Sequence, residues 1–193
     1  MNGKIFTLRN LYQSGTEKLE KAGIREAKLD AWYLLEYKTG ISRAVFLADP
    51  DREVEEEKAE SYQKDICTRA RRIPLQHITG EQEFMGLNFK VNENVLVPRQ
   101  DTETLVEEAL KTVKPGMKVL DMCTGSGCII ISILHNVEGV KGYAVDISKQ
   151  AVNVAKENAK LNEVPVLFER SDLFEMVTEK FDVIVSNPPY YVD

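Results

Sequence analysis

The stretch 181–190 is the part of the chain whose residue types most directly suggest chemistry. A short β-branched run there leads into Asn187-Pro188-Pro189-Tyr190, which predicts a buried strand that stops at a rigid, polar turn. Neither proline has an N–H group and both have a fixed φ, so the carbonyl groups of the turn are available as acceptors. An amide side chain, carbonyl groups and an aromatic ring at a strand end could bind a planar group that donates hydrogen bonds.

A glycine-containing loop forms a second candidate site. Residues 121–127 read Asp-Met-Cys-Thr-Gly-Ser-Gly, and the glycines allow the backbone to turn tightly and to approach a ligand closely. The loop departs from the dinucleotide-binding fingerprint, because Ile130 stands where that pattern has its third glycine. The acid Asp121 before the turn suits a cationic ligand better than a pyrophosphate. S-adenosylmethionine, which carries a sulfonium and an ammonium group, fits this description.

Two more acids follow the next predicted strands. Asp146 lies roughly 20 residues beyond the loop, where a carboxylate can accept hydrogen bonds from ribose hydroxyl groups. Asp172 could accept from an adenine amino group, while Leu173 or Phe174 packs on the ring. Any one of these acids could be only a cap or a loop residue. Acids at the ends of successive strands favour a nucleoside-like ligand.

The elements that would position these residues alternate along the second half of the chain. The predicted order is strand 117–122, helix 127–136, strand 140–147, helix 148–161 with Ser148 as its N-cap, strand 164–168 and strand 181–186. Such a series predicts an α/β fold with a parallel sheet and right-handed crossovers. Ligands of these sheets bind beyond the carboxyl ends of the strands, where all the candidate residues fall.

The first part of the chain is predicted to be a small helical bundle. A first helix lies within 8–24, and a second, strongly apolar helix ends at Gly40. The apolar residues of the second helix are Leu29, Trp32, Tyr33, Leu35 and Tyr37. Asp49 is expected to cap a long helix with Pro50 at its first position, and Pro74 ends that helix.

Composition and charge exclude several classes of protein. The chain is 43% hydrophobic and 29% charged, as is usual for a globular domain, and no apolar run approaches the roughly 20 residues of a membrane span. The net charge of −6 argues against a large nucleic-acid-binding surface. The cysteines match no zinc spacing and the histidines are isolated, so we expect no metal site and free thiols in a reducing cytoplasm.

The candidate residues resemble a known class of enzymes. The loop 121–127, together with Asp146 and the turn 187–190, is similar to class I S-adenosylmethionine-dependent methyltransferases that modify amino groups. N6-adenine and glutamine methyltransferases share this signature. The resemblance therefore implies a Rossmann-like methyltransferase domain and methyl transfer to an amino group, and it leaves the substrate open.

Upstream motifs resemble one family within that class. Residues 74–80 read Pro-Leu-Gln-His-Ile-Thr-Gly, residues 84–91 read Phe-Met-Gly-Leu-Asn-Phe-Lys-Val, and residues 97–103 read Val-Pro-Arg-Gln-Asp-Thr-Glu. These resemble the peptide chain release factor N5-glutamine methyltransferases, the HemK/PrmC family. His77 and Gln100 stand where the family usually has Tyr and Pro.

The resemblance implies a substrate and a set of site residues. The substrate would be the glutamine of the Gly-Gly-Gln loop in class 1 release factors, with the helical part and a hairpin docking the body of the factor. The cofactor would contact Asp121, Cys123, Thr124, Gly125, Ser126, Gly127, Asp146, Asp172, Leu173 and Asn187. The glutamine would contact Asn187, Pro188, Pro189 and Tyr190, of which Asn187, Pro188 and Tyr190 would be catalytic.

The chemistry of a carboxamide explains why such a turn is needed. Its nitrogen is a poor nucleophile, because the lone pair is delocalised into the carbonyl group. If the Asn187 side-chain oxygen and the Pro188 carbonyl each accept one amide N–H, the lone pair turns toward the methyl group. Tyr190 would pack on the amide plane, and no ionised base is needed before transfer.

The sequence predicts three parts and an unusual end. These are a helical bundle over 1–75, a β-hairpin linker over 76–97 and a methyltransferase domain over 98–193. Sheets of this class normally add further strands after the fourth, so we expect a truncated chain. A hydrophobic edge strand left by truncation could pair with another chain, and the activity of the chain itself is left open.

Two other functions are compatible with parts of the sequence. An N6-adenine methyltransferase would use the same turn for a flipped base, although the acidic charge and the lack of a basic, aromatic-rich segment argue against nucleic acid as a partner. A non-catalytic module that only docks a ribosomal factor is the second alternative.

Overall fold

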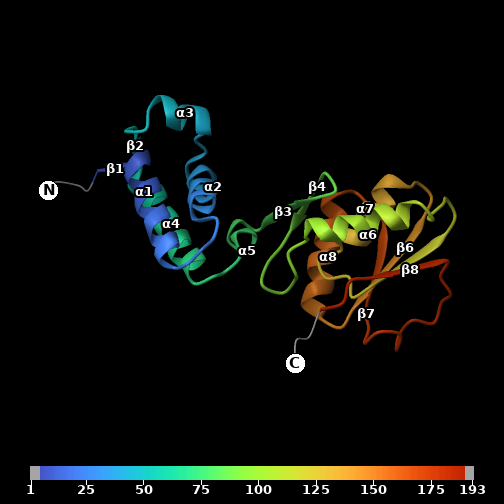
Figure 1. Ribbon diagram of the computed structural model, residues 1–193. Helices are drawn as coiled ribbons and strands as arrows, with labels where there is room; N and C mark the ends of the chain where they lie inside the picture. Colours follow the sequence, from blue (N-terminus) through green and yellow to red (C-terminus); the bar gives the residue numbers. More distant parts are fainter. Residues whose placement is uncertain (1–4, 190–193) are drawn as a thin grey trace. The chain divides into compact units, whose positions relative to one another are not determined.

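A computed structural model describes residues 5–189 and divides the chain into two compact units, residues 1–79 and 80–193 (Figure 1). In the described part of the chain, the longest and most apolar helices still fall short of what crossing a membrane requires.

The first unit is a bundle of helices with a short two-stranded ribbon. Its elements are β1 (Phe6–Thr7), α1 (Leu8–Lys21), α2 (Ala27–Thr39), α3 (Arg43–Ala48), β2 (Glu53–Val54), α4 (Glu56–Ala70) and α5 (Leu75–Thr79). The Thr7 side chain accepts from the Asn10 amide at the start of α1, and Gly40 ends α2 in the left-handed conformation. The core contains fully buried residues from α1, α2 and α4, among them Leu8, Leu11, Leu34, Leu35 and Tyr62.

The predicted cap at Asp49 is wrong. Asp49 ends α3, and α4 begins only at Glu56. The intervening segment is used elsewhere, because the carbonyl groups of Pro50 and Arg52 accept the first amide N–H groups of α1. These amides have no partner within their own helix, so tertiary pairing overrides the local signal.

The second unit contains the predicted parallel sheet. Its strands are β5 (Lys118–Met122), β6 (Lys141–Asp146), β7 (Val166–Arg170) and β8 (Val183–Ser186), in the order β7-β6-β5-β8 with every neighbouring pair parallel. The helices α7 (Cys128–Asn136) and α8 (Lys149–Leu161) connect the first three strands. The α/β fold is therefore confirmed, and the switch in strand order lies between β5 and β8.

Strand β7 starts later than the predicted Val164. The Val164 amide donates to the Ala159 carbonyl, and Glu163 has a φ of 56°, which together close the end of α8. The strand can begin only after this cap.

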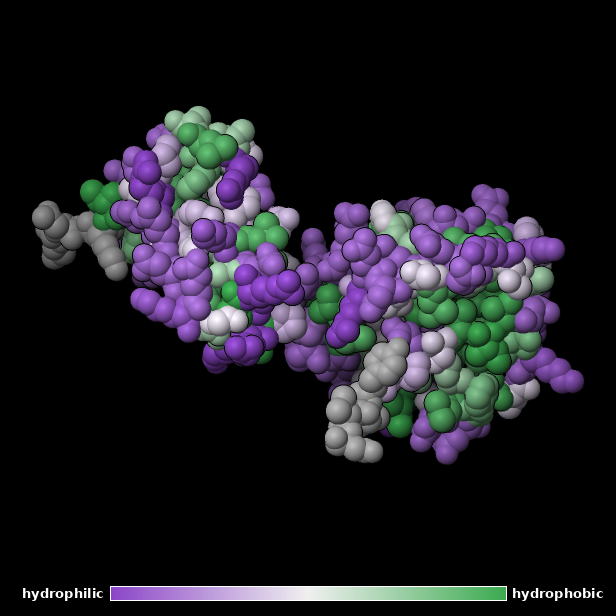
Figure 2. Space-filling view, viewed as in Figure 1, coloured by the Kyte–Doolittle hydropathy of each residue, from purple (hydrophilic) through white to green (hydrophobic). Residues whose placement is uncertain are grey.

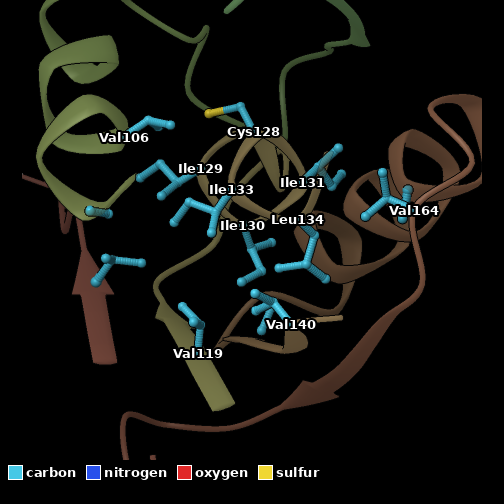
Figure 3. Close-up of a cluster of buried hydrophobic side chains, with 14 of the residues drawn as sticks. Val106, Val119, Cys128, Ile129, Ile130, Ile131, Ile133, Leu134, Val140 and Val164 are labelled. Atoms are coloured by element: carbon cyan, nitrogen blue, oxygen red, sulfur yellow. The ribbon is translucent and has the colours of Figure 1, made fainter. Parts of the chain in front are cut away.

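One face of the sheet carries the main core. The helices α6 (Gln100–Leu110), α7 and α8 contribute to it (Figure 1). Figure 3 shows isoleucine side chains radiating from α7 toward Val106, Val119, Val140 and Val164. Along β5, Val119 belongs to this core, whereas Leu120 and Met122 belong to a smaller cluster. The side chains of β5 thus alternate between the two faces of the sheet.

The predicted hairpin is present and belongs to the second unit. It consists of β3 (Glu81–Phe84) and β4 (Leu87–Lys90), which pair antiparallel around Met85 and Gly86. Both turn residues have positive φ, as a two-residue hairpin turn with the right twist requires. Phe84 and Phe89 anchor the hairpin in the main core with an edge-to-face contact at 6.1 Å. The residues before it form α5, so the hairpin starts at Glu81.

Candidate active site

A cavity of about 1040 Å³ opens where β5, β6 and β8 end. Its wall comes from the segment before α6, from α6 itself and from the strand ends. The lining residues are Asn94, Val95, Leu96, Arg99, Asp101, Thr102, Leu105, Met122, Cys123, Gly125, Asp146, Ile147, Ser148, Ala151, Ser171, Asp172, Leu173, Ser186, Asn187, Pro188 and Pro189. The cavity lies at the switch point of the sheet, where the topology predicts a ligand site.

The glycine-containing loop is a tight, strained turn. Cys123, Gly125 and Gly127 have φ angles of 62°, 54° and 81°, a region that non-glycine residues rarely occupy. Only Cys123 and Gly125 of these three line the cavity. A Cβ atom at Gly127 would lie 3.1 Å from the Cβ of Ala155, so this glycine allows α7 to approach α8 closely. Gly125 has open space at the same position.

Asp121 lies beneath the loop and is fully buried. The Thr124 hydroxyl donates to its Oδ2 at 2.7 Å, and no hydrogen-bond partner is present for Oδ1 among the residues that the structure describes. Burial raises the pKa of this carboxyl to about 7, against the lowering effect of the Thr124 hydrogen bond. The structure therefore places Asp121, Thr124, Ser126 and Gly127 inside the fold, whereas the cavity wall contains their neighbours Cys123 and Gly125.

Asp146 joins the loop to the next helix. Its Oδ2 accepts the Gly125 amide N–H at 2.9 Å, and its Oδ1 accepts the Ser148 amide N–H at 2.9 Å. The Ser148 side chain in turn caps α8, as predicted. Both carboxylate oxygens are thus fixed by backbone donors at the cavity wall, and each retains acceptor capacity for a ligand.

The segment after β7 is held by a buried serine. The Ser171 hydroxyl donates to the Leu173 carbonyl at 2.8 Å and accepts the Met176 amide at 3.0 Å. Leu173 has a φ of 46° and, like Asp172, lines the cavity; Phe174 is exposed and does not.

The turn after β8 closes the other side of the cavity. Asn187, Pro188 and Pro189 line it, and Tyr190 lies outside the described residues. The Asn187 side-chain Nδ2 donates to the Thr102 hydroxyl at 3.2 Å. The amide nitrogen is therefore directed at α6, and Oδ1, the only acceptor atom of this side chain, is directed away from Thr102.

Three residues that support the site had no role in the sequence prediction. Asn158 is fully buried in α8, where its Oδ1 accepts the Lys90 amide at 2.7 Å and its Nδ2 donates to the carbonyls of Lys90 and Ser126. The Glu103 carboxylate accepts the Met85 amide of the hairpin turn at 2.8 Å. Thr102, whose hydroxyl accepts from Asn187, is the third supporting residue. Thr102 and Glu103 belong to the motif at residues 97–103, whereas nothing in the sequence distinguishes Asn158 from any other asparagine within a helix.

Comparisons with known proteins identify the family of the chain. Family models described as the PrmC N-terminal domain and the methyltransferase small domain match residues 10–80 and 100–193. The release factor glutamine methyltransferase of Koribacter versatilis is 38% identical over 95% of this chain and 67% of its own length. That of Geobacter sulfurreducens is 36% identical over 97% of this chain and 66% of its own length.

A solved structure is similar to more than half of the chain. The crystal structure of wild-type Trm5b from Pyrococcus abyssi is 29% identical, with a TM-score of 0.50 over 58% of this chain and 34% of that chain. The chain spans about two thirds of the length of the curated relatives it matches. By its similarity over nearly all of its own residues, the chain belongs to the release factor glutamine methyltransferase family.

Proposed function

We propose that this chain binds S-adenosylmethionine and positions the Gly-Gly-Gln glutamine of a class 1 release factor for methylation of its side-chain nitrogen. One observation carries the proposal: a single cavity joins two carboxylates, Asp146 and Asp172, to the carboxamide of Asn187 and the Pro188 backbone. The first pair suits a nucleoside and the second suits an amide, so cofactor and substrate groups can meet in one cavity.

The residues on the wall fit the cofactor. Gly125 offers open space at its Cα, so a ligand can approach the loop backbone closely. Asp146 is held in place to accept ribose hydroxyl groups, and Asp172 with Leu173 suits the adenine ring. The role proposed for Asp121, Thr124, Ser126 and Gly127 is to shape the loop from inside the fold. When bound, the cofactor supplies an electrophilic methyl group.

The turn after β8 would orient the substrate amide. The Asn187 Oδ1 and the Pro188 carbonyl each accept one N–H of the glutamine carboxamide, which fixes the plane of the amide. With both hydrogens held in that plane, the nitrogen lone pair is directed out of it, toward the cavity. Pro189 has no N–H that could compete for these acceptors. The proposed packing of Tyr190 on the amide falls on a residue outside the described part.

The first unit offers a surface for the body of the release factor. Leu29, Tyr33 and Tyr37 follow one another at helical spacing along α2 and are 46%, 46% and 50% exposed. Figure 2 shows another hydrophobic patch over α3, where Leu47 is 69% exposed. We further propose that these surfaces dock the factor. The variants Leu29→Glu and Tyr33→Glu should then raise KM for the whole factor and leave KM for a short Gly-Gly-Gln peptide unchanged.

The reaction is tested with purified protein, a purified class 1 release factor and cofactor labelled in its methyl group. We expect label on the glutamine of the factor and none when that glutamine is replaced by alanine. Asn187→Ala should abolish transfer while calorimetry still detects cofactor binding. Asn153→Ala, an exposed asparagine outside the cavity, is the matched control.

Two results would contradict the proposal. Transfer by Asn187→Ala at the rate of the unchanged protein would remove the amide from the mechanism. Label on adenine in DNA or RNA, with none on the factor, would favour the adenine methyltransferase instead.

The cysteines Cys67, Cys123 and Cys128 form no disulfide bonds. Free thiols support a further proposal that the enzyme works in the reducing cytoplasm, where release factors act.

A further inference from the structure

The hydroxyl of Thr102 stands between a carboxylate and the carboxamide of Asn187. Thr102 is 8% exposed, in the first turn of α6, and its Oγ1 donates to the Asp101 Oδ1 at 3.3 Å while it accepts from the Asn187 Nδ2 at 3.2 Å. All three residues line the same cavity. They form a short relay from the start of α6 to the end of β8.

The numbers of donor hydrogens and acceptor lone pairs on these three side chains determine which group donates in each hydrogen bond. An ionised carboxylate can only accept, and a hydroxyl group has one hydrogen, so donation to Asp101 leaves only lone pairs on Thr102 for Asn187. The carboxamide of Asn187 can meet a lone pair only with its NH2 group. While the Thr102 hydroxyl donates to Asp101, rotation of that amide by a half-turn would set Oδ1 against the Thr102 oxygen, acceptor against acceptor, so the reversed orientation requires that the hydroxyl give up its bond to Asp101.

The orientation of the Asn187 amide decides what it can bind. With Nδ2 on Thr102, the side chain offers an acceptor to a ligand; in the reversed orientation it offers a donor. A glutamine NH2 group requires acceptors, so only the first orientation is compatible with methylation of the substrate nitrogen. Reversal would favour the carbonyl end of the same amide and turn the nitrogen away.

We infer that Thr102 is a positioning residue that selects the productive orientation of the Asn187 carboxamide and so determines which end of a substrate amide is presented for transfer. This inference rests on the proposed function. Thr102 does not touch the substrate in this scheme; it acts through Asn187, and Asp101 acts through Thr102.

The test compares two substitutions of Thr102. Thr102→Val keeps the branched shape and removes the hydroxyl, whereas Thr102→Ser keeps the hydroxyl. We expect kcat to fall by about 10- to 100-fold in Thr102→Val, with the cofactor Kd within about two-fold and kcat largely restored in Thr102→Ser. Thr112→Val, an exposed threonine just after α6, is the control for the same change of shape.

A second measurement is independent of turnover. NMR of protein labelled with ¹⁵N in asparagine side chains, assigned with Asn187→Ala, reports the two Nδ2 protons directly. We expect slow exchange with water and distinct shifts in the unchanged protein and in Thr102→Ser, and faster exchange in Thr102→Val. Absence of methyl transfer by the unchanged protein would refute the proposed function while this spectrum still tests the positioning. Unchanged Asn187 signals and kcat in Thr102→Val, or equal loss in Thr102→Ser, would overturn the inference.

Discussion

Replacement of the buried Asn158 should destabilise the second unit more than any surface substitution. This side chain makes three hydrogen bonds to backbone groups, to the Lys90 N–H at 2.7 Å, the Lys90 carbonyl at 3.0 Å and the Ser126 carbonyl at 2.9 Å. The Asn158 side chain accepts the N–H of Lys90 and donates to its carbonyl group, as the backbone of a neighbouring strand would. The same amide therefore joins α8, the hairpin and the glycine-containing loop.

The magnitude follows from these contacts. An intramolecular hydrogen bond contributes about 1 kcal/mol net, and a buried group left without a partner loses more. Asn158→Ala removes three bonds and leaves an amide and two carbonyls to be satisfied, so we expect a loss of about 3 kcal/mol. Domains of this size are stabilised by roughly 5–15 kcal/mol, so the loss is a large part of the total.

The assay is urea unfolding at about 25 °C, followed by circular dichroism, with the midpoint and slope analysed together. Asn158→Asp tests the hydrogen bonds without a change of volume, because its oxygen would replace the donor that now faces two carbonyls. Asn162→Ala is the matched control, since its Nδ2 donates only to the carbonyls of Asn88 and Asn158 in a partly exposed setting. We expect about 1 kcal/mol there. Losses at position 158 no larger than in this control would refute the reasoning.

Four further substitutions probe the loop and the hairpin. The folded-state pKa of Asp121 is about 7 against an ordinary 3.8, so its contribution to stability is fully present below about pH 4 and is lost as the pH rises to about 7. The free energy of unfolding of Asp121→Asn should therefore rise relative to that of the unchanged protein by up to about 4 kcal/mol between about pH 4 and pH 8. The exposed control Glu138→Gln should show no such rise. A difference between Asp121→Asn and the unchanged protein that does not vary with pH would contradict this prediction. Gly125→Ala should destabilise the protein by roughly 1–2 kcal/mol through left-handed backbone strain and should weaken cofactor binding in calorimetry. Gly127→Ala should destabilise the protein by more, because of these two glycines only Gly127 has no room for a Cβ atom. Equal unfolding midpoints for the two variants would refute this difference. Glu103→Ala, which removes the acceptor of the hairpin-turn amide, should lower stability by about 1–2 kcal/mol in urea unfolding, and an unchanged midpoint would show that this contact contributes nothing.

The sequence predicted the elements of the second unit because each carries its own signal. Short runs of apolar, often β-branched residues mark the strands, and Ser148 marks the start of α8 with a side chain that caps it. Helix and strand boundaries that depend on contacts with distant residues could not be predicted from the local sequence. Asp49 has the residue type of a cap, but the carbonyls that follow it are drawn to the amides of α1.

For the candidate site, strand topology located the cavity but not the direction of each side chain. Asp146 and Asn187 line the cavity because parallel strands end at the same edge of the sheet. Asp121 also lies near the end of its strand, yet it is two residues from Val119 and so shares the face that is covered by helices. Counting residues in twos along the strand would have indicated that this acid is buried.

The polar contacts that fix the shape of the site join residues far apart in the sequence. Asn158 and Lys90 are separated by 68 positions, and Asn187 and Thr102 by 85. Hydrophobic periodicity determines which face of an element is buried, and it tolerates small rotations or shifts of that element. A hydrogen bond between buried groups does not, because its distance and angle have a narrow range and a lost partner is costly. Apolar burial therefore selects the fold, while a few long-range polar pairs hold the loop, the hairpin and the amide turn in register. Those pairs arise only once the elements have packed, so no local pattern in the sequence can reveal them.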